Sequence, residues 1–218
     1  GSSMELKNVI IQNGSAPISG GCLFIGDSSS VAASGLRISE CHSAAGGGLY
    51  MVGKSILHVQ NCTVLSSTAF AGGAIYSSSS GLLQMSASLL VNNSAALGGA
   101  IMLTGGAVGQ TALPLAFAAT GFCGNRASAA FTTGSVPALS GLGSGGAVFW
   151  DTSALTNASM LSVIRAVQSQ LETDSAAVCD QPNTATAAPS AWAGSPALYL
   201  VNSDQTQAAL SLYPNAPL

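Results

Sequence analysis

The sequence predicts an all-β fold, a single-stranded parallel β-helix in which each strand pairs with its equivalent one coil further on. A glycine pair followed by a small residue and then an apolar residue recurs along the 218 residues. The first four copies begin at Gly20, Gly46, Gly72 and Gly98, a constant spacing of 26 residues. A fixed period of this length indicates a stack of like units. Between the glycine pairs, apolar residues alternate with period 2, which is typical of strands with one buried face.

Each unit is expected to contain three short strands. Two are alternations, seen at Val31-x-Ala33 and Leu36-x-Ile38, and the third follows the glycine pair. Equivalent positions of successive repeats form columns. The columns of these two alternations recur one and two periods later, at Leu57-x-Val59, Cys62-x-Val64, Leu83-x-Met85 and Ser88-x-Leu90. Three strands per period predict one coil of a solenoid.

The register extends over residues 1–218 as one domain of about six coils. Met4-x-Leu6 and Val9-x-Ile11 fit the two columns at the start, and Leu115-x-Phe117 fits further on. Insertions near 105–112, 128–144 and 164–194 are expected to project from corners. Ser195–Leu200 is a degenerate copy of the glycine-pair motif. Residues 160–172 also have the apolar spacing of an amphipathic helix, but a strand through 163 preserves the register.

Neither end of the chain carries an amphipathic helix or a polar cap. An uncovered end coil exposes backbone groups and apolar core, which solenoids ordinarily cap. We therefore expect this domain to be a segment of a longer chain, or to have another chain seated on its ends.

Composition argues against two classes of protein. Charged residues make up 6% of the chain and the net charge is −3, so no basic patch for nucleic acid is expected. Glycine or serine interrupts every apolar run before it reaches the 18 residues of a membrane-spanning helix. The segment is therefore not expected to span a membrane.

Two motifs carry a resemblance to a known family. Leu90-Val91-Asn92-Asn93 precedes Gly98-Gly99-Ala100-Ile101, and Phe122-Cys123-Gly124-Asn125 precedes Gly145-Gly146-Ala147-Val148. This pairing resembles the Phe-x-x-Asn and Gly-Gly-Ala-Ile repeat of polymorphic outer membrane proteins. Other coils depart from it, with Cys41 and Ser67 in the asparagine column. The resemblance implies a right-handed β-helix at a cell surface and identifies no activity.

Asparagines and cysteines are interpreted mainly as structural residues. Asn93 and Asn125 are expected to form turn ladders between coils. Cys22, Cys41 and Cys62 replace small or apolar residues and are expected to be buried free thiols, whereas Cys123 and Cys179 are the candidate disulfide. Candidate N-glycosylation sites follow the Asn-x-Ser/Thr pattern at Asn13, Asn61, Asn92 and Asn157.

Catalysis is not expected. Polysaccharide lyases and hydrolases need carboxylates grouped on neighbouring coils. The eight acidic residues of this chain are scattered, and His42 and His58 have no serine or cysteine partner at a persuasive spacing. No catalytic, cofactor-binding or metal-binding residue is predicted.

The strand after each glycine pair carries the candidate contact surface. Successive strand residues point to opposite faces, so only one of its two apolar columns can line the interior. We assign the aliphatic column to the core and the aromatic-rich column to the surface, at Phe24, Tyr50, Tyr76, Met102, Phe149 and Tyr199. An outward apolar stripe predicts an interaction site, although an insertion with Trp192 could fold over it.

These features predict a structural or interaction module of an extracellular or cell-surface protein. Its partners would be other protein chains or flanking repeats, with glycans as a second possibility and nucleic acid excluded. The alternative function is an adhesive or carbohydrate-binding module that uses the aromatic stripe.

Overall fold

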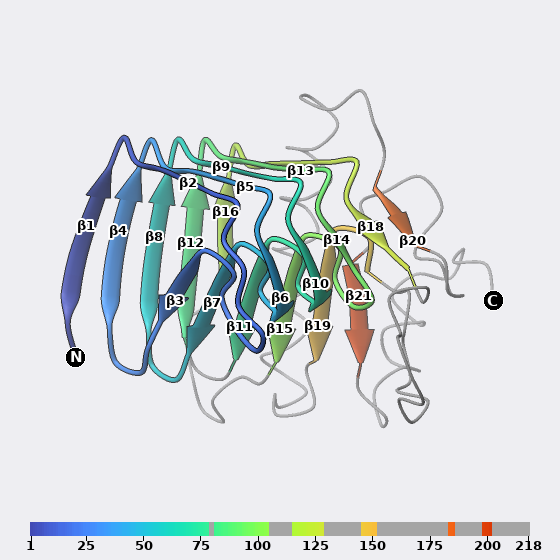
Figure 1. Ribbon diagram of the computed structural model, residues 1–218, viewed down its shortest axis with the longest axis horizontal. Helices are drawn as coiled ribbons and strands as arrows, with labels where there is room; N and C mark the ends of the chain where they lie inside the picture. The colour runs from blue at the N-terminus through green and yellow to red at the C-terminus, as the bar shows by residue number, and fades with distance from the viewer. Residues whose placement is uncertain (79–80, 105–114, 129–144, 152–182, 186–197, 202–218) are drawn as a thin grey trace.

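The computed structural model forms an elongated β-solenoid whose coils stack along its long axis (Figure 1). It describes residues 1–78, 81–104, 115–128, 145–151, 183–185 and 198–201. These residues form strands, turns and bends, and no helix is found among them. The strands belong to four parallel sheets, which we name A to D in the order in which each coil passes through them.

Sheets A and B hold the two predicted alternations. Sheet A has the order β1-β4-β8-β12-β16, and sheet B has the order β2-β5-β9-β13-β17. The strands of sheet A are β1 (Ser3–Lys7), β4 (Ser30–Ser34), β8 (Ile56–Gln60), β12 (Leu82–Ser86) and β16 (Leu115–Ala118). Those of sheet B are β2 (Ile10–Gln12), β5 (Arg37–Ser39), β9 (Thr63–Leu65), β13 (Leu89–Val91) and β17 (Gly121–Cys123).

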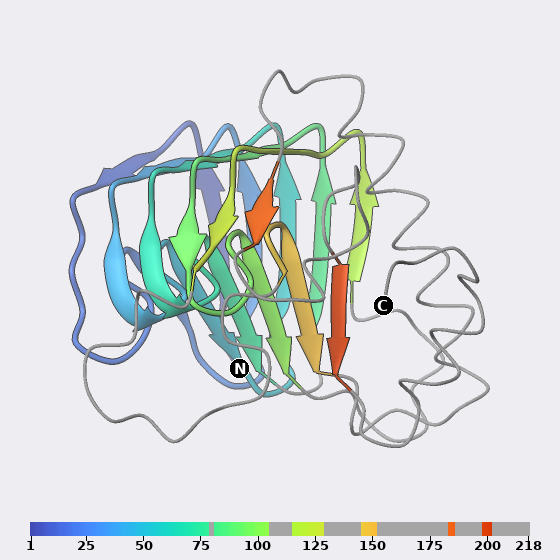
Figure 2. The same cartoon turned by 90° about the vertical axis from the view of Figure 1, so that its right-hand side faces the viewer.

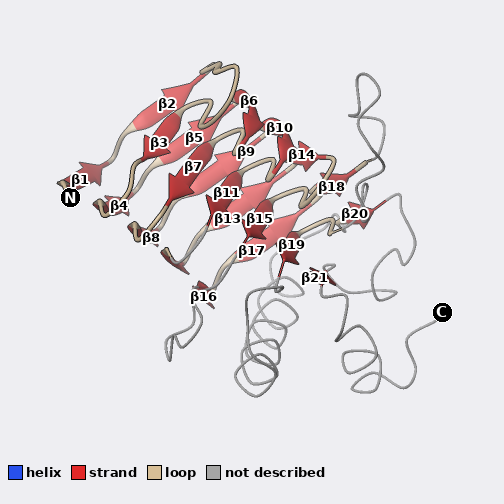
Figure 3. Cartoon of the chain, turned by 90° about the horizontal axis from the view of Figure 1, so that it is seen from below, coloured by secondary structure: helices blue, strands red, loops and turns tan. Residues whose placement is uncertain are grey.

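Sheets C and D lie on either side of the glycine pairs. Sheet C consists of β6 (His42–Ala45), β10 (Thr68–Ala71), β14 (Ser94–Ala95), β18 (Arg126–Ala127) and β20 (Thr184–Ala185). Sheet D consists of β3 (Leu23–Ile25), β7 (Leu49–Val52), β11 (Ile75–Ser78), β15 (Ile101–Thr104), β19 (Val148–Asp151) and β21 (Leu198–Val201). Figure 3 shows the strands of successive coils lying side by side, as parallel pairing requires.

The predicted register is confirmed in sheet D. Leu23 pairs with Leu49, Leu49 with Ile75, and Ile75 with Ile101. Val148 and Leu198 continue this column, so the described part of the last, degenerate repeat forms a strand at Leu198–Val201. The column is interior, because Leu49, Ile75, Ile101 and Val148 are at most 2% exposed. A continuous core of such residues runs along the solenoid axis.

Three corners of the coil are made by residues with a positive φ. Asparagine and glycine tolerate this left-handed backbone best, which explains why they recur there. The corner between sheets A and B is formed by Asn8, Gly35, Asn61, Ala87 and Ala119, and that between B and C by Asn13, Glu40, Ser66, Asn92 and Gly124. The corner between C and D has the first glycine of each pair, at Gly20, Gly46, Gly72, Gly98 and Gly145.

The second glycine of each pair is required by the next coil. A Cβ atom on Gly73 would lie 2.2 Å from the carbonyl oxygen of Gly99. The same close approach occurs at Gly21, Gly47 and Gly99. Coils can therefore stack at this corner only where no side chain is present.

Sheet C corrects the prediction of three strands per coil. Its strands are as short as two residues and are rich in serine, threonine and alanine, so they lack the apolar alternation that indicated the other strands. One of them, β20, lies inside the predicted 164–194 insertion and pairs with β18 through Arg126 and Thr184. The other proposed insertions, the possible strands at 156–163 and the possible helix at 160–172 lie outside the described residues.

Candidate interaction surface

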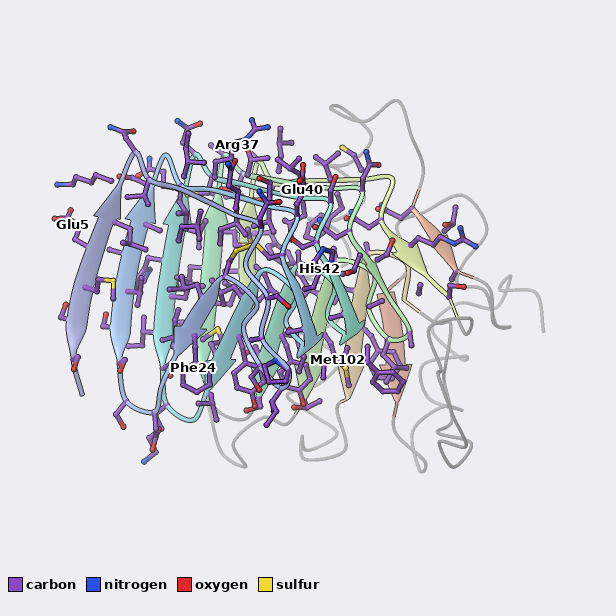
Figure 4. All side chains as sticks on the ribbon, viewed as in Figure 1. Glu5, Phe24, Arg37, Glu40, His42 and Met102 are labelled. Carbon is purple, nitrogen blue, oxygen red and sulfur yellow. A yellow bond between two sulfur atoms is a disulfide. The ribbon has the colours of Figure 1, made fainter. Side chains whose placement is uncertain are left out.

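The aromatic-rich column of sheet D points outward, as the alternation predicted. Phe24 pairs in register with Tyr50, and Tyr50 with Tyr76. Their rings stack along the solenoid axis: the Phe24 and Tyr50 centroids are 5.4 Å apart with planes at 8°, and those of Tyr50 and Tyr76 are 5.1 Å apart at 2°. Figure 4 shows Phe24 and Met102 along the same side of the solenoid.

Exposure decreases along this column, so only part of the predicted outward stripe is accessible. Phe24 is 56% exposed, Tyr50 and Tyr76 are partly buried, and Met102 and Phe149 are 8% and 3% exposed. Tyr199 continues the register opposite Phe149, but its side chain lies outside the described part of the structure. The accessible part of the column is therefore Phe24, Tyr50 and Tyr76, which we call the aromatic stack.

A small apolar cluster outside the solenoid explains why the later residues are covered. Met102 and Phe149 pack with Ala71 and Leu97 from the corner before sheet D, and with Phe70 and Tyr76. Tyr76 thus joins the aromatic stack to this cluster, and its hydroxyl also bonds the Thr104 hydroxyl at 3.1 Å. This outward column of sheet D is continuously apolar, open at Phe24 and covered at Phe149.

The asparagine column forms a buried ladder, in agreement with its predicted structural role. The Asn93 and Asn125 side chains are fully buried. The backbone N–H of Ser67 donates to Asn93 Oδ1, that of Asn93 to Asn125 Oδ1, and that of Asn125 to Asn183 Oδ1, at 2.9–3.0 Å. Each amide also donates from Nδ2 to a backbone carbonyl, at Val64, Leu90 and Phe122. These amides are fully used inside the solenoid and offer nothing to a ligand.

A second ladder lies at the corner between sheets A and B. The backbone N–H of Leu36 donates to Cys62 Sγ at 3.3 Å, and that of Cys62 donates to Ser88 Oγ at 3.1 Å. Thr120 continues the column and donates to the Met85 carbonyl at 3.2 Å. Cys62 is a free, buried thiol, as predicted, and burial raises its pKa. Its sulfur acts as a structural acceptor.

Cys22 and Cys41 form a disulfide, which corrects the prediction that both are free thiols. Their Cα atoms are 5.8 Å apart. Cys22 occupies the small-residue column after the glycine pair, and Cys41 occupies the asparagine column one coil later, so the two columns face each other across the interior. Cys123 is also disulfide-bonded, and Cys179, its predicted partner, lies outside the described residues.

The candidate glycosylation sites coincide with the coil corners. Asn13, Asn61 and Asn92 are exposed and have φ values of 58°, 52° and 53°. After Asn61 and Asn92, Cys62 and Asn93 belong to the buried ladders, and Thr63 and Ser94 begin the strands β9 and β14. Corner geometry therefore accounts for the asparagine of each of these three sites. Glycosylation remains a prediction, and Asn157 lies outside the described residues.

Charged side chains on the described surface are few and act locally. Lys7 and Glu5 form an exposed ion pair at 2.7 Å. The backbone N–H of Lys54 donates to Asp27 Oδ1 at 2.9 Å, and this bond lowers the pKa of Asp27. His42 bonds the Thr68 hydroxyl of the next coil. No group of three metal-ligating side chains is found among the described residues.

Comparison with known proteins leaves the surface as the main guide to function. No family model matches the chain, and neither a curated protein nor a solved structure matches it. The described residues also contain no helix with the length and apolarity needed to cross a membrane.

Proposed function

We propose that this chain is a rigid β-solenoid scaffold that contacts other protein chains or flanking repeats through the aromatic stack of sheet D. The observation that carries the proposal is the gradient of exposure along one column. Met102 and Phe149 are already covered by apolar residues of the same chain, whereas Phe24, Tyr50 and Tyr76 present a similar surface without complete cover. Accessible apolar surface of this continuity is typical of interaction sites.

Ring geometry favours a protein partner over a glycan. A sugar ring binds an aromatic side chain by lying on its face. In the aromatic stack, neighbouring rings are nearly parallel with centroids 5.1–5.4 Å apart, so the faces of Tyr50 are covered by Phe24 and Tyr76. The outward parts of the rings are mainly edges, which suit packing against aliphatic and aromatic side chains. The carbohydrate-binding alternative would depend largely on the open face of Phe24.

An extracellular or cell-surface location is the setting we propose. Cys22 and Cys41 are bonded and Cys123 is also in a disulfide. Disulfides persist in oxidising compartments and are rare in the cytosol of most organisms. The resemblance to the polymorphic outer membrane protein repeat supports the same setting, and with it a role as a structural rather than catalytic module.

We further propose that the solenoid is right-handed and has about six coils. Crossovers between parallel strands of one sheet are right-handed in nearly all proteins. Six strands in sheet D support the number of coils.

The test is the association of the full chain and of its Tyr50→Ser/Tyr76→Ser variant, measured by sedimentation velocity over a range of concentrations. We expect the unmodified chain to associate as concentration rises, because the aromatic stack becomes covered in the complex. The double variant should keep the circular dichroism spectrum of a β-solenoid and associate at least about tenfold more weakly, since two interface aromatics of this kind contribute more than about 1.4 kcal/mol.

Two controls distinguish the surface from the core. Gln12→Ala/Thr63→Ala removes polar side chains from the outer face of sheet B and should leave association unchanged. Met102→Ser lies in the same column as the aromatic stack but is buried, so it should lower the free energy of unfolding. If the Tyr50/Tyr76 variant unfolds as Met102→Ser does, or if it associates normally, the proposal is wrong.

A further inference from the structure

The outer face of sheet A forms a groove that the aromatic stack does not use. The groove has a volume of about 730 Å³ and crosses β1, β4, β8, β12 and β16. Its volume lies within the range typical of ligand sites. Figure 1 shows these strands side by side, and Figure 2 shows the solenoid turned by 90° about the vertical axis.

Two rows of outward side chains line the groove. One row runs through Ala32, His58, Gln84 and Ala116, and the other through Ser34, Gln60, Ser86 and Ala118. The small residues in these rows leave room above the backbone, and the larger polar ones reach into it. The rows repeat at the strand spacing of about 4.8 Å.

Hydrogen bonding in the groove must come from side chains. The inner strands β4, β8 and β12 are each paired on both sides, so their backbone groups are occupied within the sheet. The side chains of His58, Gln60 and Gln84, in contrast, make no hydrogen bond to any other residue that the structure describes. Each glutamine amide offers both a donor and an acceptor, and the imidazole offers two ring nitrogens for hydrogen bonds.

The groove favours an uncharged ligand. Its ionised side chains are Glu5 and Lys7, which lie at one end and neutralise each other as an ion pair. A phosphate polymer or an acidic polysaccharide would meet no net positive charge. An extended peptide would pair with a strand edge, which sheet A has at β1, and not with the face of the sheet where the groove lies.

From this arrangement we propose that the groove of sheet A binds a neutral oligosaccharide, with successive sugar units placed over successive strands. Sugar hydroxyls both donate and accept hydrogen bonds, as the amides of Gln60 and Gln84 do. A polymer with a repeat close to the strand spacing would place each unit next to one side chain of each row. The site is on a different sheet from the aromatic stack, so it stands or falls independently of the proposed scaffold function.

The experiment is isothermal titration calorimetry of the full chain with cellohexaose, mannohexaose and laminarihexaose, and with hexagalacturonate as an acidic comparison. At least one neutral hexasaccharide should bind with a Kd below about 1 mM. The Gln60→Ala/Gln84→Ala variant should weaken that binding about tenfold, since two hydrogen bonds are lost. Ala32→Trp should fill the groove and abolish binding while the circular dichroism spectrum is unchanged, because Ala32 is exposed.

The matched control is again Gln12→Ala/Thr63→Ala on sheet B, which should bind as the unmodified chain does. The proposal is overturned if none of the neutral hexasaccharides binds, if hexagalacturonate binds more tightly than they do, or if the groove variants leave the affinity unchanged. Loss of binding in the Tyr50→Ser/Tyr76→Ser variant alone would also overturn it, because the site would then be the aromatic stack.

Discussion

Asn93 and Asn125 lie in adjacent coils, and Asn125 Oδ1 accepts hydrogen bonds from both the backbone N–H and the side-chain Nδ2 of Asn93, each at 3.0 Å. Both side chains are fully buried. Removing one of them would leave donors and acceptors in adjacent coils without partners.

Asn93→Ala should lower the free energy of unfolding by roughly 2–4 kcal/mol, because the Ser67 N–H and the Val64 carbonyl lose their partner in a buried site. Asn93→Ser should cost less, since Ser67 occupies the same column and its hydroxyl accepts from Cys41 N at 3.4 Å. Urea denaturation measures both. Asn92→Gly is the control and should change stability by less than about 0.5 kcal/mol, because glycine also adopts a positive φ. Equal loss in all three variants would contradict the ladder.

Gly73→Ala should destabilise the solenoid by about 3 kcal/mol or more, because the new methyl group would overlap the Gly99 carbonyl oxygen of the next coil. Gly26→Ala is the matched control. Among the described residues its Cβ would meet only the Phe24 ring, at 3.7 Å, so the variant should be neutral or slightly stabilising. Thermal unfolding of both variants tests the difference, and a tolerated Gly73→Ala would show that the coils stack less closely than described.

Cys22→Ala/Cys41→Ser should lower the free energy of unfolding by about 3 kcal/mol, the amount expected for opening a loop of this length. Alanine and serine are chosen because Ala74 and Ser67 occupy the same columns in later coils, so packing is preserved. Urea denaturation under oxidising conditions is the measurement. A stability equal to that of the unmodified chain would mean that this disulfide adds nothing to the fold.

Alkylation with iodoacetamide should identify the state of the five cysteines. At pH 8 the folded chain should react slowly, because Cys62 is buried and burial raises its pKa above the ordinary value. In urea without reductant one cysteine should be modified, and after reduction all five. Mass spectrometry counts the additions and should find a peptide joining Cys123 to Cys179. Three modified cysteines before reduction would rule out that second bond.

Asp27→Asn should remove part of the acid sensitivity of the fold. The backbone N–H of Lys54 lowers the pKa of Asp27 below its ordinary 3.8. Its contribution is therefore present above the unfolded pKa and lost as pH falls through the lower folded pKa. The asparagine oxygen can still accept from Lys54 but does not titrate, so the urea midpoint should fall less below pH 4. Glu40→Gln, whose side chain makes no hydrogen bond in the described part of the chain, should retain the acid sensitivity.

Sequence periodicity was sufficient for the register of sheets A, B and D, because their columns repeat apolar residues at a spacing of 26 in the central coils and the same pattern resumes after each insertion. It could not predict sheet C, whose strands contain few large apolar residues. In β14, for example, Ser94 and Ala95 have no alternation to detect. The ladder role of Asn93 and Asn125 was predictable from their column alone.

The Cys22–Cys41 disulfide and the burial of Met102 depend on how close different columns of side chains lie to one another. The repeat period shows which residues share a column, but not which columns are neighbours in space. Cys22 and Cys41 are 19 residues apart, and nothing in the spacing shows that their columns face each other in adjacent coils. Likewise, burial of Met102 arises from Leu97 and Phe149 at a corner whose shape was unknown. The groove on sheet A was missed for the same reason, because its side chains are unremarkable until the strands are placed together.

The asparagine ladder also gives the solenoid a direction. From Cys41 to Asn125, every backbone N–H of the column donates to the side chain of its C-terminal neighbour. The asparagine side chains in turn donate from Nδ2 to a backbone carbonyl of the coil before them. A defect in one rung therefore deprives the preceding rung of its acceptor and leaves the backbone N–H of the following rung bonded. Loss of one side chain from the ladder should therefore destabilise mainly the coil on its N-terminal side.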